Sequence, residues 1–448
     1  MAIKAKLTTF DTTMVVVSLV IGIGIFRTPA IVATKAGHRP AVFFVAWILG
    51  GFISLLGALT FAEIGSRYAR PGSFYKIVAE HYGSAPAFML NWTNVIIVNG
   101  AGVAAVSIIG AEHLNPILLP AKLQTPTAVQ LTAAALTLVL LVINWLGIKP
   151  GAWAQNILTA LKVGMIGLIV IAALHYGAGP APVAAAATSN GSWWPALAAA
   201  LISVFYTYGG YHHTINLGAD VKNAPKNMPR AIFLGVLIII ACYLSINFAY
   251  VRVLGLSGVA SAKLVAAETA KSVFGNFGYL FVSLGIVISA LGFLNATLMH
   301  MPRIYYAMAE DRALPPLFKK VHPRTQAQES GLLFLGGMIL ISIFFLGTFE
   351  SIVNYVMFLD CANIAVVAST IFVLRRKARA TAASYDGYKA PLYPVLPALF
   401  VIFLLGISLN ILLTQTKQAL IGTAFFATGF PFFLLMRRIN KSRETDRR

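Results

Sequence analysis

The fold is decided by residues 20–26, which read VIGIGIF and lie in the middle of the apolar segment 13–34. Two glycines two positions apart weaken a helix and let another group approach the backbone closely. A second glycine pair occurs in FYTYGGY at residues 205–211, near the middle of the apolar segment 194–217. Glycine-interrupted helices at matching positions of two halves indicate an inverted-repeat architecture with broken first and sixth helices. The alternative is that these glycines only permit close helix packing.

The composition around these segments places the chain in a membrane. Of its 448 residues, 58% are hydrophobic and 11% are charged, and the mean hydropathy is +0.80. Soluble domains carry roughly 25% charged residues. Only helices and closed barrels satisfy the backbone in lipid. Continuous apolar runs near the ~20 residues that span a bilayer favour an all-α fold over the alternating pattern of a barrel. Twelve transmembrane helices are predicted, at residues 13–34, 41–66, 86–112, 127–146, 154–176, 194–217, 230–253, 275–308, 331–348, 351–375, 393–413 and 418–436.

The distribution of basic residues predicts the orientation. With the N-terminus in the cytoplasm, 25 of the 34 Lys and Arg residues fall on the inner side, 8 on the outer side and one, Lys162, within a span. This bias follows the positive-inside rule. We therefore expect a multi-pass protein of the cell (cytoplasmic) membrane with both termini cytoplasmic. The net charge of +20 lies in short loops, so it does not indicate a nucleic-acid partner.

The inverted-repeat interpretation divides the chain into three parts. Residues 1–176 hold spans one to five as one repeat, and residues 194–376 hold spans six to ten as the other. Residues 391–448 hold the last two spans and a cytoplasmic tail. The uncharged segment 177–193, rich in Ala, Pro, Gly and Ser, is expected to be an irregular linker. The first apolar run is too long for the core of a signal peptide, so it is expected to be the first span.

Lys162 is the one Lys or Arg deep within a predicted span, where a charge is costly and usually functional. Its expected partners are backbone carbonyls of the broken first helix, around Gly22, and a hydroxyl such as that of Ser289 in the eighth span. An ammonium there can replace a sodium ion as a structural cation or act as a proton switch. A lysine that snorkels to the interface is the structural alternative. Glu63 and Asp220 are expected to pair with Arg or Lys near the inner surface.

The remaining polar residues in or near the spans give weaker signals. Arg27 follows the first break and can pair with an outer carboxylate or attract anions, and the roles of His213 and Asp360 stay open. Histidines 212, 213 and 300 show no converging acids in the sequence, so no metal site is expected. The chain has no P-loop, nucleophile motif or H-E-x-x-H motif, so neither an enzyme nor an ATP-driven pump is expected, and no cofactor.

Six motifs in order along the chain resemble those of the amino acid–polyamine–organocation (APC) superfamily, in particular its branch of L-type amino acid transporters and bacterial amino acid permeases. The resemblance covers roughly spans one to ten. The motifs are GIGIF at 22–26, AEIG at 62–65 with PGSFY at 71–75, Gln155, Thr159 and Lys162 in the fifth span, YGG at 208–210, DVKNAPKNMPR at 220–230, and LP at 314–315 with VHP at 321–323.

The resemblance implies the leucine-transporter (LeuT) fold, with alternating access around a site at the membrane midplane. Amides at Ile23 and Gly24 would hold a substrate carboxylate, while backbone carbonyls of the two breaks would receive its amine. Tyr206 would be the gating aromatic and His212 would face the substrate side chain. Lys162 would stand where sodium-coupled relatives bind sodium, which implies sodium independence. The full set implied to bind substrate is Val20, Ile23, Gly24, Tyr206, Thr207, Gly209 and His212.

The expected function is sodium-independent transport of neutral L-amino acids, by exchange or by proton symport. The apparent lack of acidic residues in the pocket argues against cationic substrates. A polyamine or organic-amine permease is the alternative within transport, and a transporter-like amino acid sensor that does not transport is the alternative outside it. The expected partners are an amino acid, the lipid bilayer and, in the case of symport, protons. No obligate heavy-chain partner is implied, because both cysteines, Cys242 and Cys361, lie inside apolar runs.

Overall fold

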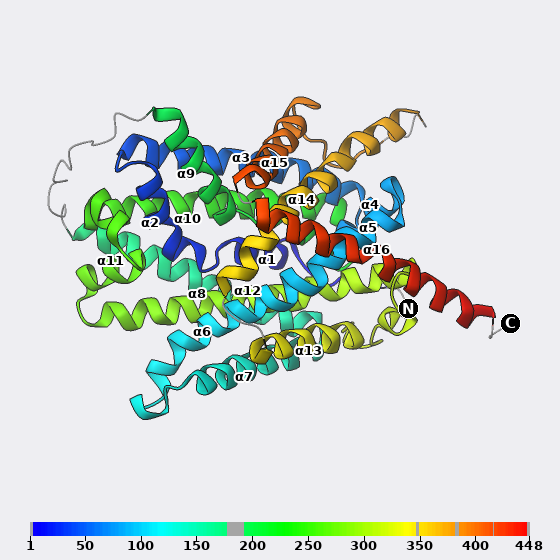
Figure 1. Cartoon of the computed structure of the whole chain (residues 1–448), viewed down its shortest axis with the longest axis horizontal. Helices are drawn as coiled ribbons and strands as arrows, with labels where there is room; N and C mark the ends of the chain where they lie inside the picture. The colour runs from blue at the N-terminus through cyan, green and yellow to red at the C-terminus, as the bar shows by residue number, and fades with distance from the viewer. Residues whose placement is uncertain (1–2, 177–191, 346–348, 381–384, 415, 446–448) are drawn as a thin grey trace.

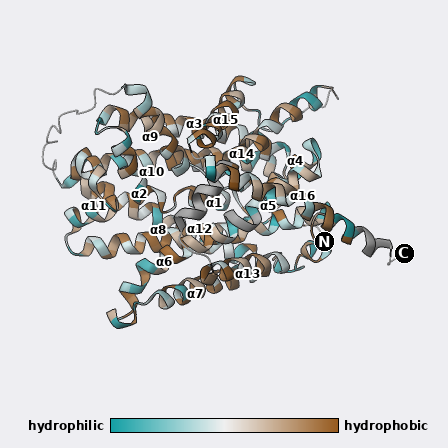
Figure 2. Ribbon diagram, viewed as in Figure 1, coloured by the Kyte–Doolittle hydropathy of each residue, from teal (hydrophilic) through white to brown (hydrophobic). Residues whose placement is uncertain are grey.

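The computed structural model describes residues 3–176, 192–345, 349–380, 385–414 and 416–445, and every regular element within these ranges is a helix. Nearly all of the predicted linker at 177–193 lies outside the described residues. The two ends of the chain lie at the same end of the molecule (Figure 1). Hydrophobic residues cover most of the helices and hydrophilic ones gather toward the tips and loops (Figure 2). The all-α membrane class predicted from composition is confirmed.

The first span is broken at the predicted glycines. Helices α1 (Thr9–Val20) and α2 (Gly24–Lys35) are bent by 46° relative to each other. Helix α1 starts with a capping box, in which the Thr8 hydroxyl accepts the Asp11 N–H and the Asp11 carboxylate accepts the Thr8 N–H. The residues between α1 and α2 are not helical, so the end of α1 and the start of α2 meet inside the molecule.

The sixth span is broken in a similar way. Helix α9 (Trp193–Thr207) stops before the second glycine pair, and the 3₁₀ helix η3 (Tyr211–Asn216) follows it. Gly210 has a φ of 116°, and a Cβ there would lie 2.5 Å from the carbonyl oxygen of Leu19 in α1. Only glycine fits both conditions. The broken segments therefore lie against each other because Gly210 lets the two backbones approach.

The other predicted spans are present at or near their expected positions. Eight helices are each long and apolar enough to cross a membrane, and the bent pair α1–α2 makes a ninth. Helices α9, α13 and α14 supply the remaining three of the twelve predicted spans in the described part of the chain. The bounds are α3 (Pro40–Arg67), α6 (Gly102–Leu118), α7 (Pro126–Trp145), α8 (Ile148–His175), α10 (Ala224–Ser261), α12 (Phe277–Glu310), α13 (Glu329–Phe345), α14 (Phe349–Ala380), α15 (Val395–Thr414) and α16 (Thr416–Thr445).

Several elements go beyond the sequence prediction. The third span is composite, since α5 (Ser84–Thr93) continues through a π-helix, η1 (Asn94–Ala101), into α6. Short amphipathic connectors also occur where loops were expected. They are α4 (Ser73–Tyr82), η2 (Ala121–Leu123), α11 (Val265–Phe274) and η4 (Pro316–Lys319). π-Helical turns are rare and are found mostly at functional sites. The π-helix η1 supplies Asn99 to the central cavity described below.

Helix α3 presents a glycine face to the broken sixth span. A Cβ at Gly50 would lie 2.4 Å from the Val204 side chain of α9, and one at Gly57 would lie 1.9 Å from the Tyr211 hydroxyl of η3. Contacts below 3.0 Å essentially never occur between real Cβ atoms and their neighbours, so a side chain at either position would force Val204 or Tyr211 to move. Close packing is therefore achieved through small residues, as is common between membrane helices.

Buried ion pairs join the helices near the end of the molecule where the chain termini lie. The Glu63 carboxylate of α3 accepts hydrogen bonds from Arg67 at 2.6 Å, from Arg375 of α14 at 2.6 and 2.8 Å, and from the Ala390 N–H at 2.7 Å. Asp220 receives two hydrogen bonds from Arg303 of α12, at 2.9 and 3.0 Å. The predicted pairing of Glu63 and Asp220 with basic residues is confirmed.

Candidate functional site

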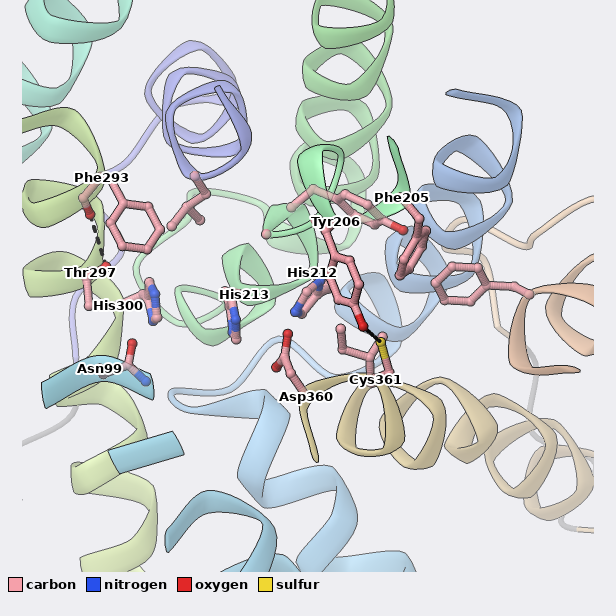
Figure 3. Close-up of a pocket in the computed structure, with 16 residues that line it drawn as sticks. Asn99, Phe205, Tyr206, His212, His213, Phe293, Thr297, His300, Asp360 and Cys361 are labelled. Carbon is pink, nitrogen blue, oxygen red and sulfur yellow. Dashed lines mark hydrogen bonds between the residues drawn. The ribbon is translucent and has the colours of Figure 1, made fainter. Parts of the chain in front are cut away.

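A cavity of about 190 Å³ lies beside the two helix breaks. It is enclosed by the end of α1, the segment from α9 to η3, the π-helix η1, and helices α12, α14 and α15. The labelled side chains in Figure 3 come from η1, α9, η3, α12 and α14. Its lining residues are Leu19, Asn99, Phe205, Tyr206, Gly209, Gly210, Tyr211, His212, His213, Phe293, Thr297, His300, Asp360, Cys361, Ile364 and Phe400.

Lys162 reaches from α8 to the break in the first span. Its ammonium donates to the Ile21 carbonyl at 2.5 Å and to the Ser18 hydroxyl at 3.2 Å, and the side chain is 1% exposed. A snorkelling lysine would hold its ammonium at the membrane surface, so the structure contradicts that alternative. Lys162 stabilises the unwound end of α1, because its ammonium donates a hydrogen bond to the Ile21 carbonyl, which lies just beyond the helix.

The hydroxyl beside Lys162 is Ser18, not the predicted Ser289. The Ser289 hydroxyl is buried, and it has no hydrogen-bond partner among the described residues. The residue of α12 that faces the ammonium is Gly292, three positions further along, where a Cβ would lie 3.1 Å from Nζ. The prediction placed the correct helix beside Lys162. It erred by about one turn along that helix, since residues three apart share a face, and an apolar segment does not specify its axial register.

The start of α2 supplies two free donors. Among the described hydrogen bonds, the amides of Ile23 and Gly24 donate to no acceptor. The N-terminal end of a helix, with its unpaired N–H groups and positive dipole, favours an anion such as a carboxylate. A Cβ on Gly24 would lie 3.4 Å from the Thr207 methyl of α9. Ile23, Gly24 and Thr207 therefore gather at the break, although none of them lines the 190 Å³ cavity.

Tyr243 of α10, which the sequence analysis did not single out, joins the two broken spans. Its hydroxyl lies within hydrogen-bond distance of the Val20 carbonyl at 2.9 Å and of the Thr207 carbonyl at 3.1 Å. The Val20 carbonyl also accepts the Gly22 N–H at 2.8 Å. Val20 was expected to receive a substrate amine. In this conformation its oxygen already accepts one backbone N–H and has the Tyr243 hydroxyl within reach.

Tyr206 lies between two cavities. It lines the central cavity and also a second one of about 660 Å³ between α2, α9 and α15. Its hydroxyl accepts a hydrogen bond from the Cys361 thiol at 3.7 Å, which is drawn as a dashed line in Figure 3. Its carbonyl accepts the Gly209 N–H at 3.2 Å. Tyr206 is thus shared by two cavities, and its gating role stays a prediction.

Three histidines and an aspartate converge in the central cavity. His212 and His213 of η3 have ring centroids 4.2 Å apart, and His213 stacks on His300 of α12 at 5.2 Å. One carboxylate oxygen of Asp360 in α14 and ring nitrogens of His212 and His213 lie within 4.8 Å of one another. The expectation that no acid converges on the histidines, and that the pocket lacks acids, is therefore wrong.

The reason for this error is spatial. Asp360 is far from the histidines in the sequence, and nothing in the pattern of α14 indicates which of its faces meets η3.

Arg27 is not part of this group, because it lies exposed on α2, outside the central cavity. The groups brought together beside the breaks are thus a buried ammonium, two free amides, an aromatic residue between cavities, and a His–Asp cluster.

A helical membrane protein with two broken spans around a central cavity has the architecture of a secondary transporter. The comparisons agree with this class. A family model described as amino acid permease matches residues 7–435. The chain therefore belongs to the amino acid permease family.

Curated relatives extend over nearly the whole chain. The serine/threonine exchanger SteT of Bacillus subtilis (strain 168) is 29% identical over 430 residues, which cover 94% of each chain. The cystine/glutamate transporter of Homo sapiens is 25% identical over 97% of this chain and 85% of its own. Large neutral amino acids transporter small subunit 2 of Homo sapiens is 25% identical over 97% of this chain and 81% of its own. These relatives are transporters and exchangers, which agrees with the expectation of an amino acid transporter and not an enzyme.

Proposed function

We propose that this protein is a sodium-independent exchanger of neutral L-amino acids in the cell membrane, with both termini in the cytoplasm. The observation that carries the proposal is the ammonium of Lys162, held 2.5 Å from the Ile21 carbonyl at the break. A fixed cation beside unwound carbonyls takes the place that a coupling sodium ion would need. The relative named as a serine/threonine exchanger favours exchange over proton symport. The inner position of the termini rests on the excess of basic residues in the corresponding loops.

The proposed site for the substrate backbone is the pair of breaks. The free amides of Ile23 and Gly24 bind the carboxylate, and carbonyls of the broken sixth span, at Tyr206 and Gly209, receive the amine. The side chain extends into the central cavity toward His212. In this proposal residues 1–176 and 194–376 act as the two inverted repeats that move relative to each other around this site.

An organic-amine permease is the second candidate, and Asp360 is the observation that favours it. A carboxylate in the central cavity can pair with an amine or a cationic side chain. The free amides of Ile23 and Gly24 favour an amino acid instead, because an amine without a carboxylate leaves these two donors unused. The two candidates therefore differ in whether the substrate needs its carboxylate.

The test is uptake of labelled neutral amino acids into proteoliposomes that contain only this chain. Vesicles are either preloaded with unlabelled amino acids or left empty, sodium is absent, and a pH gradient is applied in a parallel set. We expect uptake only into preloaded vesicles. Uptake into empty vesicles driven by an alkaline interior would replace exchange with proton symport. Competition by decarboxylated amines but not by amino acids would overturn the amino acid proposal.

The same vesicles test whether the chain acts without a heavy chain. Cys242 lies in α10 and Cys361 lines the central cavity from α14, so neither is placed to form a disulfide with a partner at the outer surface. We therefore expect the purified chain alone to transport. Activity that appears only after membrane extract is added would contradict this expectation.

A further inference from the structure

The His–Asp cluster has buried nitrogen and oxygen atoms that no described protein group satisfies. His212 Nε2, His213 Nδ1, His300 Nδ1 and Asp360 Oδ1 are all buried, and none has a hydrogen-bond partner among the described residues. Leaving one buried polar group unpaired costs about 1–3 kcal/mol, and more for a charged group. A polar ligand, an ion or ordered water in the cavity would satisfy these four atoms.

The geometry limits what that ligand can be. The ligand atoms of His212, His213 and Asp360 lie within 4.8 Å of one another, so one point between them is no more than about 2.8 Å from all three. Zn–N bonds are about 2.0–2.1 Å long and Zn–carboxylate bonds about 2.0–2.2 Å. Side-chain movements of less than about 1 Å therefore bring all three atoms to bonding distance of one ion.

The donor chemistry selects the class of ion. Neutral imidazole suits zinc, copper, iron and nickel, whereas magnesium and calcium prefer sites made entirely of oxygen atoms. Two imidazoles and one carboxylate form the ligand set of many zinc sites that keep a fourth position open for water or a solute. The open side of this set is the 190 Å³ cavity, which is large enough for such a group.

The surroundings of the cluster support a cation. Ring faces of Phe61 and Phe74 lie 5.6 and 5.7 Å from the ring of His212, measured between centroids, and they fix its orientation. His300 stacks almost parallel to His213, with an interplanar angle of 4°. Asp360 has no ion pair with any described Lys or Arg. A metal ion would compensate its buried negative charge, which is otherwise expensive.

We propose that His212, His213 and Asp360 bind a divalent transition-metal ion of the zinc type in the central cavity, with His300 as a positioning residue behind His213. Binding does not depend on the proposed transport function, because it needs only the three side chains that line the cavity. The ion occupies the space between η3 and α14, so it joins the broken sixth span to the tenth span.

The test is a Co²⁺ titration of the detergent-purified full-length chain carrying a histidine-free affinity tag. Bound Co²⁺ is followed by its visible absorption, and Zn²⁺ is then added to displace it. We expect one Co²⁺ per chain, displaced by Zn²⁺ but not by Mg²⁺. Replacing outer-shell partners of a metal already costs about 10–100-fold in affinity, so His212→Ala and Asp360→Asn should each weaken binding by at least that factor.

His113→Ala is the matched control, because His113 lies on α6 outside the cavity and its Nδ1 is within hydrogen-bond distance of the Ile109 carbonyl of its own helix. It should bind Co²⁺ like the unmodified chain. His300→Gln should shift the absorption spectrum while keeping the one-to-one stoichiometry. Each variant is measured on its monodisperse fraction, and the rise in melting temperature on adding metal is recorded as an independent readout. Absence of stoichiometric Co²⁺ binding by the unmodified chain, or full binding by the double variant His212→Ala/Asp360→Asn, would overturn the proposal.

Discussion

Replacing Tyr243 by phenylalanine tests the contact between the two broken spans. The substitution removes one hydroxyl that lies 2.9 Å from the Val20 carbonyl and 3.1 Å from the Thr207 carbonyl. The Val20 oxygen keeps the Gly22 N–H as a donor at 2.8 Å, whereas no other described donor reaches the Thr207 oxygen. Tyr243→Phe therefore leaves one buried carbonyl unpaired.

The expected loss of stability follows from this one unpaired carbonyl. One buried acceptor left without a partner costs about 1–3 kcal/mol, and the volume of the ring is unchanged, so no cavity contribution is added. We expect Tyr243→Phe to lower the free energy of unfolding by about that amount. Chemical denaturation in detergent micelles measures it, with melting temperature as a second readout.

Tyr250→Phe is the matched control for this experiment. Tyr250 lies on the same helix, is 0% exposed like Tyr243, and its hydroxyl has no hydrogen-bond partner among the described residues. Removing a buried hydroxyl that makes no bond is neutral or stabilising. If Tyr243→Phe were as stable as Tyr250→Phe, the contact between the broken spans would contribute nothing and the reasoning would be refuted.

Three further substitutions address the ion pairs and the breaks. Asp220→Asn leaves the buried guanidinium of Arg303 without its carboxylate, so it should lower the free energy of unfolding by about 3–5 kcal/mol in chemical denaturation. Arg70→Gln, at an exposed ion pair, should lower it by less than about 1 kcal/mol. Equal losses for the two variants would contradict the argument from burial. Gly210→Ala, at a φ of 116°, should cost roughly 1–3 kcal/mol and reduce exchange; a stable and active variant would show that the breaks do not need this contact. Lys162→Met removes a hydrogen bond from a charged group, which is worth about 1.5–3 kcal/mol. Counterflow by the folded variant should therefore slow by roughly 10–100-fold. Unchanged rates would show that transport does not need the ammonium.

The sequence predicted a structural feature correctly wherever a single segment contained all of the information needed. Continuous apolar runs predicted the spans, because the bilayer imposes a length on each helix independently of its neighbours. The glycine pairs predicted both breaks, since the positive φ of Gly210 is a property of its own backbone. Lys162 was identified because a charge inside an apolar run is conspicuous in any arrangement of helices.

The errors came from contacts between segments. Ser18 was missed and Ser289 was chosen because the axial register between apolar helices leaves little trace in their sequences. Asp360 was not placed beside His212 because no local pattern joins α14 to η3. Tyr243 was missed for a further reason, since a tyrosine in an apolar run reads as an ordinary core residue until its hydroxyl is seen between two carbonyls.

The glycine face of α3 has a consequence for mutational tolerance. Every amino acid other than glycine carries a Cβ, so any missense change at Gly50 or Gly57 places an atom 2.4 or 1.9 Å from a neighbouring side chain. Neither residue lines the central cavity. A saturation-mutagenesis map scored by growth would nevertheless mark both as intolerant, alongside the residues that touch the solute. Intolerance at these two positions therefore reports how closely α3 packs against the broken sixth span, and it should not be counted as a sign of substrate contact.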